Sequence, residues 1–232
     1  MNKEEGARSL VQNGWLSRST PDFQRALLAI ATWREVEAGE TVGLTGDLGG
    51  NLCGVASGQV GYANGLGSSI TPVVQIGHAG SWVGILPILG IPRASDTTAR
   101  TAALVASMPI AWVRALLDEH PHWWRHIADL ALEFTLTYAT AMTDLMIRDS
   151  RQRCIAVLLR VGGCRFQDVA LAAPPTIVLT QEELSAMANL SPYPTGKILR
   201  ELDRQGLIKL GYRSVKLLQP ATLRASLIDM GL

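Results

Sequence analysis

The C-terminal third of the chain constrains the fold most, because its helical patterns are short and each ends at a clear stop signal. Thr180-Gln-Glu-Glu183 is a capping box, in which the Thr hydroxyl and the Glu carboxylate satisfy free backbone N–H groups. A helix is therefore expected from there through Met187 or Ala188. After a turn at Asn189-Leu190, a second helix is predicted from about Pro194 to Gln205, with a glycine at its C-cap. Two short helices joined in this way form a helix-turn-helix.

A helix before this pair and a hairpin after it complete a larger unit. The segment Arg151 to Val161 is helical in pattern and ends at Gly162-Gly163. The runs Ile208 to Leu210 and Val215 to Leu218 flank a polar turn, which predicts a β-hairpin, and Pro220 begins a closing helix. The order helix, turn, helix and hairpin is that of a winged helix-turn-helix.

The second helix of the pair has one apolar and one cationic face. Ile198, Leu199 and Leu202 form its buried stripe, which leaves the cations on the opposite side. Long donors of this kind reach guanine edges and phosphates, and Gly196 is expected to let the backbone approach a DNA groove. A solvated helix face is the alternative. The residues expected at DNA are Thr180, Ser191, Tyr193, Thr195, Gly196, Lys197, Arg200, Arg204, Lys209, Arg213 and Lys216.

Net charge separates this region from the rest of the chain. The whole sequence has 21 Lys and Arg against 20 Asp and Glu, but residues 1–150 hold 10 basic and 14 acidic side chains, whereas residues 151–232 hold 11 and 6. A basic C-terminal third beside an acidic remainder fits a domain that meets a polyanion. A chance distribution of surface charge is the other interpretation.

Residues 36–110 are rich in glycine and β-forming residues, and apolar positions often alternate with others. This pattern predicts many short strands joined by tight turns, in a sandwich or roll. The segment Gly46-Asp-Leu-Gly-Gly-Asn51 lacks the Lys-Ser/Thr ending and the following helix of a phosphate-binding loop. A hairpin turn is expected there instead.

A long helix is predicted between these two regions, from about residue 122 to 148, after a break at Pro121. Apolar residues recur along it at alternating steps of 4 and 3, a heptad stripe that favours pairing with a second copy of the helix. A helix packed only on its own domain is the alternative. The stripe expected at the dimer interface is Ile127, Ala131, Phe134, Tyr138, Ala141 and Leu145.

Several classes of protein do not fit this sequence. Its longest uncharged apolar stretch, Trp82 to Pro92, has about half the ~20 residues of a membrane helix, and Met1 to Arg18 lacks the apolar run of a secretory leader. A cytoplasmic protein is therefore expected. Three scattered cysteines form neither a disulfide framework nor a four-thiolate iron-sulfur site. His122 and His126 lack a third ligand, so an exposed helix face is favoured over a metal site, and no catalytic signature is present.

Two stretches carry a resemblance to a known family. Leu179-Thr-Gln-Glu-Glu-Leu184 and Ile198-Leu-Arg-Glu-Leu202 are similar to the helix-turn-helix of Crp/Fnr-type bacterial transcription regulators. Gly80-Ser-Trp-Val-Gly84, with Ile91-Pro-Arg-Ala-Ser95, is similar to the phosphate-binding cassette of their cyclic-nucleotide-binding roll. The resemblance covers nearly the whole chain. It implies an α+β fold with a jelly-roll-like, double-stranded β-roll sensor at residues 1–120, a dimerisation helix at 121–150 and a winged helix-turn-helix at 151–232.

The chain departs from the family at the effector site. Where the cassette carries a Glu that holds a ribose hydroxyl, this chain has Ile85, and the Arg-Ser/Thr pair reads Arg93-Ala94. An unpaired buried hydroxyl costs roughly 1 to 3 kcal/mol, so cyclic AMP control is not expected, and no cofactor is assigned. A polar cavity near Arg93 would favour a small anionic effector. The candidate effector residues are Gly84, Ile85, Arg93, Ala94, Ser95 and Thr135.

The second helix of the pair, which is expected to read the DNA bases, also departs from the family pattern. Pro192, Tyr193 and Lys197 stand where family members carry Arg-Glu and Arg, so the operator sequence is expected to differ. Ser191 to Tyr193 is expected to be extended, because Pro194 disfavours a helical residue before it. The hypothesis is a homodimeric, sequence-specific regulator, not an enzyme, whose partners are a palindromic operator in double-stranded DNA and RNA polymerase. The alternatives are a ligand-binding or protein-interaction module with a vestigial helix-turn-helix, and a cyclic-nucleotide-responsive regulator.

Overall fold

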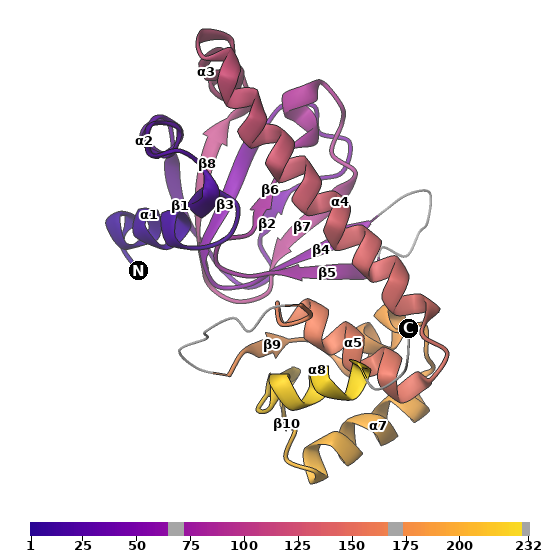
Figure 1. Ribbon diagram of the computed structural model, residues 1–232. Coiled ribbons are helices and arrows are strands. Elements are labelled where there is room, and N and C mark those ends of the chain that lie inside the picture. Colours follow the sequence, from indigo (N-terminus) through magenta and orange to yellow (C-terminus); the bar gives the residue numbers. More distant parts are fainter. Residues whose placement is uncertain (65–71, 167–173, 229–232) are drawn as a thin grey trace. The chain divides into compact units, whose positions relative to one another are not determined.

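Two antiparallel sheets dominate the first half of the computed structural model, which describes residues 1–64, 72–166 and 174–228 (Figure 1). The strand orders are β1-β8-β3-β6 and β2-β7-β4-β5, so the chain crosses repeatedly from one sheet to the other. This confirms the predicted α+β class and the roll of short strands. The strands are β1 (Thr32–Val36), β2 (Thr41–Gly43), β3 (Asn51–Ser57), β4 (Val60–Asn64), β5 (Val73–Gly77), β6 (Trp82–Val83), β7 (Ser95–Ala99) and β8 (Ala103–Pro109).

The strands of the first sheet separate two apolar cores, because successive side chains of a strand point to opposite faces. Cys53, Val55 and Val105 pack between the two sheets. Leu52 and Ala106 face the other way, against helices that sequence reasoning did not predict at the N-terminus. These helices are α1 (Lys3–Gln12), η1 (Leu16–Arg18) and α2 (Pro21–Ala29).

The loop from Gly46 to Asn51 is not the expected hairpin turn. It joins β2 to β3, and these strands belong to different sheets and do not pair. The short helix η2 (Leu86–Leu89) follows β6. After β8 come α3 (Ile110–Glu119), η3 (Pro121–Trp123) and α4 (Trp124–Met146), so the break at Pro121 and the long helix are confirmed.

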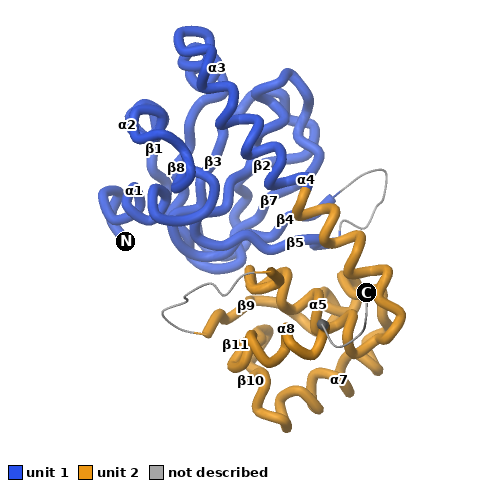
Figure 2. The backbone as a smooth tube through the Cα atoms, viewed as in Figure 1, with its two compact units in different colours: residues 1–135 blue, residues 136–232 orange. Residues whose placement is uncertain are grey.

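The chain divides within α4 into two compact units, residues 1–135 and 136–232 (Figure 2). The second unit contains the predicted helices, and its sheet has the order β10-β11-β9. Strand β9 was not predicted. The elements are α5 (Ser150–Val161), β9 (Thr176–Val178), α6 (Gln181–Met187), α7 (Pro192–Arg204), β10 (Ile208–Gly211), β11 (Ser214–Leu217) and α8 (Pro220–Ile228).

Both ends of the helix pair follow from local chemistry. Thr180 Oγ1 accepts from the Glu183 N–H at 3.1 Å and a Glu183 carboxylate oxygen accepts from the Thr180 N–H at 2.8 Å, which confirms the capping box. Helix α7 begins at Pro192, so the expected extended segment through Tyr193 is wrong. The first turn of a helix leaves its N–H groups without helical partners, so Pro192 and Pro194 remove no helical hydrogen bond.

Candidate nucleic-acid interface

Helices α6 and α7 approach closely at Gly196. The residue is buried, and a Cβ atom there would lie 2.9 Å from Nε2 of Gln181, which donates to the Pro192 carbonyl at 2.8 Å. Thr195 is also buried, and its hydroxyl donates to the Ser191 carbonyl at 3.0 Å. The prediction that Thr195 and Gly196 lie on the outward face is therefore wrong. Gly196 packs α7 against α6, and Thr195 is buried beside it in the chain.

The outward face of α7 carries Tyr193, Lys197 and Arg200, all exposed. Within the described ranges, Lys197 and Arg200 have no ion-pair partner. Arg204 differs, because its guanidinium donates to both Glu201 oxygens, at 2.7 and 3.0 Å, which lowers the pKa of Glu201. Two free cations and one partly neutralised cation thus follow one another along this helix, beside an exposed Ser191.

The β10–β11 hairpin presents its turn to solvent. Gly211 pairs with Ser214, so Tyr212 and Arg213 form a two-residue turn, with a positive φ of 48° at Arg213. Tyr212 is 93% exposed. Sequence reasoning did not select Tyr212, although an aromatic residue at a hairpin tip was a usable signal. Lys209 is exposed and lies 4.0 Å from Asp203, and Lys216 is half-buried.

Hydrogen bonds fix the hairpin and α5 to α7. Asp203 Oδ1 accepts from the Leu210 N–H at 3.0 Å, and Arg151 donates to the Gln205 side chain at 2.9 Å. Thr180 is half-buried as the N-cap of α6. The cationic face of α7 is therefore held in a fixed orientation to the hairpin, as a pre-organised binding surface requires.

The cassette arginine is bound by its own chain. Arg93 is 6% exposed, its guanidinium donates to the Asn51 carbonyl, and its Nε lies 3.9 Å from an Asp47 carboxylate oxygen. A Cβ atom at Gly84 would lie 2.7 Å from the same guanidinium. Ile85 is buried in the core behind the first sheet, while Ala94 and Ser95 are half-buried.

The first half of the predicted stripe on α4 is already covered within the protomer. Ile127 is 2% exposed, and Ala131 and Phe134 pack on the same core. Ala141 is half-buried, while Tyr138 and Leu145 are exposed. Own-domain packing, the alternative interpretation, thus holds for residues 127–134. Thr135 is exposed, and its hydroxyl donates to the Ala131 carbonyl at 2.9 Å.

His122 and His126 lie in different environments. His126 is buried, its Nε2 lies 3.2 Å from the Thr20 hydroxyl, and its ring stacks on Phe23. Burial, followed by the positive charge of Arg125, lowers the pKa of His126. His122 is exposed. The two imidazoles therefore differ in solvent access, although the charge of His122 also contributes to the lowered pKa of His126. No helix among the described residues is long and apolar enough to cross a membrane.

Comparisons with known proteins agree with this architecture. Residues 152–226 match the Crp-like helix-turn-helix domain. FixK2 from Bradyrhizobium japonicum is 15% identical, with a TM-score of 0.66 over 84% of this chain and 96% of that one. A CRP/FNR-family transcriptional regulator from Thermus thermophilus is 18% identical, with a TM-score of 0.64 over 86% of this chain and 100% of that one.

A third structure is the c-di-GMP responsive global regulator CLP of Xanthomonas campestris, which is 19% identical, with a TM-score of 0.63 over 86% of this chain and 99% of that one. None of the curated proteins matches the sequence. At such identities the structures establish the fold, and the helix-turn-helix match adds the DNA-binding domain. Residues 152–226 therefore form a Crp-like helix-turn-helix domain, and over most of its length the chain shares the fold of the solved regulators named above.

Proposed function

We propose that the protein acts as a homodimer that binds a palindromic operator through the α7 helix of each copy. The observation that carries the proposal is the outward face of α7, where Lys197 and Arg200 lie exposed beside Tyr193. In dimeric helix-turn-helix proteins the two reading helices enter major grooves about 34 Å apart. Side chains of α7 would contact base edges, and Arg213 with Tyr212 at the hairpin tip would contact the backbone.

Each part of the chain is proposed to have the role that the sequence predicts for it. In this proposal residues 1–120 form the sensor, 121–150 the dimerisation helix and 151–232 the DNA-binding domain. The regulator works in the cytoplasm, with RNA polymerase as its partner at the promoter.

The dimer seam is proposed to use the outward face of α4. Leu132, Leu136, Ala139, Thr143 and Met146 are exposed and recur at steps of 4, 3, 4 and 3, which is a heptad pattern. At about 100° per residue, this stripe lies about 140°, or two fifths of a turn, from the one that contains Ile127. Burial of such a row of apolar side chains against a second copy removes apolar surface from water.

Footprinting of the full chain on genomic DNA tests the function. Discrete palindromic sites support it, and a profile identical to that of control DNA favours the module with a vestigial helix-turn-helix. On an identified site, the variant Lys197→Ala/Arg200→Ala is expected to bind at least tenfold more weakly, with a salt slope reduced by up to about 4, because the dimer loses two cations from each copy. The variant Arg8→Ala/Arg25→Ala, which removes two exposed cations of α1 and α2, is the matched control.

We further infer that a cyclic nucleotide held by the cassette is not the effector. The Arg93 guanidinium already donates to the Asn51 carbonyl, and Ile85 is part of a core. A cyclic phosphate would have to displace the internal partners of a buried arginine. Titration calorimetry with cyclic AMP, cyclic GMP and c-di-GMP tests this inference, and saturable micromolar binding of any of them that is unchanged in the variant Arg34→Ala, outside the cassette, would overturn it.

A further inference from the structure

The inner face of the first sheet changes from apolar to polar toward one end. On β1 the inward positions are Thr32, Arg34 and Val36, and Val36 joins the core between the sheets. On β8 the register places Ser107 beside Thr32 and Val105 beside Arg34. A strand face that serves only packing is apolar along its length. Thr32 and Arg34 are exposed, so this end of the face is polar and open to solvent.

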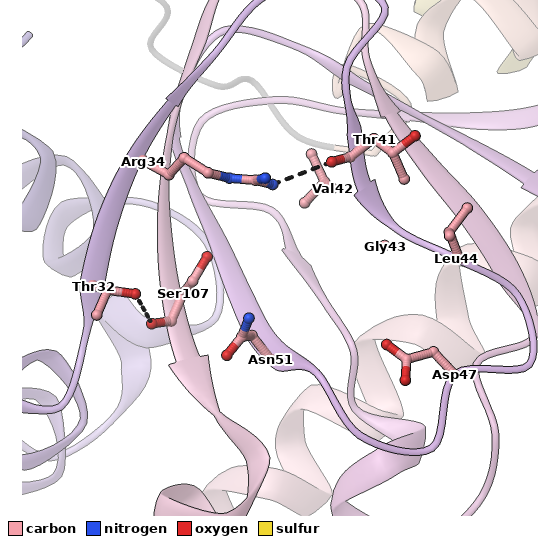
Figure 3. Close-up of a pocket in the computed structure, with 9 residues that line it drawn as sticks. All are labelled: Thr32, Arg34, Thr41, Val42, Gly43, Leu44, Asp47, Asn51 and Ser107. Atoms are coloured by element: carbon pink, nitrogen blue, oxygen red, sulfur yellow. Dashed lines mark hydrogen bonds between the residues drawn. The ribbon is translucent and has the colours of Figure 1, made fainter.

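A cavity of about 390 Å³ lies at this polar end, within the size range of small-molecule sites (Figure 3). In Figure 3 the Asn51 amide and the Ser107 hydroxyl point toward the space below the Arg34 guanidinium. Strand β2 and the loop after it form the opposite wall. The residues that line the cavity are Thr32, Arg34, Thr41, Val42, Gly43, Leu44, Asp47, Asn51 and Ser107.

Positive charge predominates around the cavity. A guanidinium carries five N–H donors, and the exposed Arg34 side chain uses one of them to donate to the Thr41 carbonyl at 3.2 Å. The buried guanidinium of Arg93 lies directly behind two lining residues, bonded to the Asn51 carbonyl and within 3.1 Å of a Cβ atom built on Gly43. Asp47 is the one carboxylate among the lining residues.

We propose that this cavity binds a small organic oxyanion, a carboxylate or a phosphate ester, that also carries hydroxyl groups. Arg34 forms a planar fork that matches the geometry of either oxyanion. The Ser107 hydroxyl and the Asn51 amide supply further polar contacts, and Asp47 accepts from a ligand hydroxyl. The cavity thus offers donors to the oxyanion end of such a molecule and an acceptor to its hydroxyl end.

This site is distinct from the cassette, because Gly84, Ile85, Arg93, Ala94, Ser95 and Thr135 are absent from its lining. Binding itself is a property of the roll. The role of the bound molecule as an effector rests on the proposed function, since it requires that the chain binds DNA.

Titration calorimetry on the full chain, without DNA, tests the proposal. The probes are L-malate for the carboxylate, glycerol 3-phosphate for the phosphate ester, and glycerol as the uncharged counterpart. Saturable binding of either anion, with none of glycerol, is the expected result, and the anion that binds identifies the class. If neither anion binds at millimolar concentration, the proposal is wrong.

Variants locate the site. Arg34→Ala is expected to weaken the binding at least tenfold and Arg34→Lys to weaken it less, because lysine keeps the charge and loses the fork. Arg25→Ala, at an exposed position of α2 outside the cavity, is expected to bind as the parent does. Equal affinity in Arg34→Ala and the parent would overturn the assignment. Lys197→Ala/Arg200→Ala should bind the anion normally, which separates this proposal from that of DNA binding.

Discussion

Asp144 and Arg160 form a buried ion pair in which Arg160 Nε donates to Asp144 Oδ2 at 3.0 Å. Arg165 Nε donates to the other carboxylate oxygen, also at 3.0 Å. The Asp144 side chain is completely buried. The pair therefore ties the last turn of α4 to α5, the first helix of the winged domain.

Replacement of Asp144 by Ala is expected to lower the free energy of unfolding by about 3 to 5 kcal/mol, because it removes a buried carboxylate that accepts from both Arg160 and Arg165. Burial already lowers the pKa of Arg160, and Asp144 opposes that shift. Urea denaturation followed by far-UV circular dichroism measures the loss. Glu201→Ala, which breaks the exposed pair with Arg204, is the control and should change stability little. An equally small change in Asp144→Ala would contradict the structural role of the buried pair.

Elements with local signals could be predicted from the sequence. The capping box at Thr180, the break at Pro121 and the hairpin around residue 212 each depend on residues close in the chain. Elements that depend on distant partners could not. Strand β9 is short and pairs with β11 from across the domain. Helix α7 begins two residues earlier than predicted, and its first carbonyl, that of Pro192, accepts from Gln181 of α6.

The candidate nucleic-acid interface could likewise be predicted only where it depends on residues close in the chain. The cationic face of α7 follows from helical spacing, but the burial of Gly196 depends on α6, which lies close to it only in the folded chain. The heptad stripe that contains Ile127 was correctly apolar, yet periodicity does not distinguish a face covered by its own domain from one free for a second copy. The partners of Arg93 are Asp47, in the loop after β2, and Asn51, at the start of β3, both more than forty residues earlier in the chain.

His126 predicts a pH dependence of stability. Its pKa is lowered in the folded chain by burial and by Arg125, against the opposing charges of Asp129 and Asp22, so the folded state favours the neutral ring. Stability should be complete above the unfolded pKa of about 6.5 and decrease as pH falls below it, by at most about 1.4 kcal/mol per pH unit. Urea unfolding between pH 8 and 5 measures this decrease. His126→Gln should lose less stability over that range, and identical profiles would show that another group is responsible.

Substitutions of Arg213 distinguish a role in DNA contact from a role in folding. Its φ of 48° is a conformation that glycine adopts without strain. Arg213→Gly should therefore keep or slightly raise stability while it weakens operator binding and reduces the salt slope by about 2, one for each copy in the dimer. Arg213→Ala should lose the same binding without the gain in stability. Fluorescence anisotropy on a labelled operator at several salt concentrations provides the measurement, and an unchanged slope in both variants would exclude a phosphate contact at the hairpin tip.

The two stripes of α4 make opposite predictions about the dimer. Leu136, 58% exposed, lies on the outward stripe, and Leu145, 46% exposed, lies on the stripe that continues from Ile127. A carboxylate placed in an apolar seam loses its hydration without a partner, so Leu136→Glu is expected to shift the chain toward monomer, whereas Leu145→Glu should remain dimeric. Sedimentation velocity at several concentrations measures both. The two variants are matched, because the same substitution is made on one helix. A monomeric Leu145→Glu together with a dimeric Leu136→Glu would show that the dimer interface uses the stripe first predicted from the sequence.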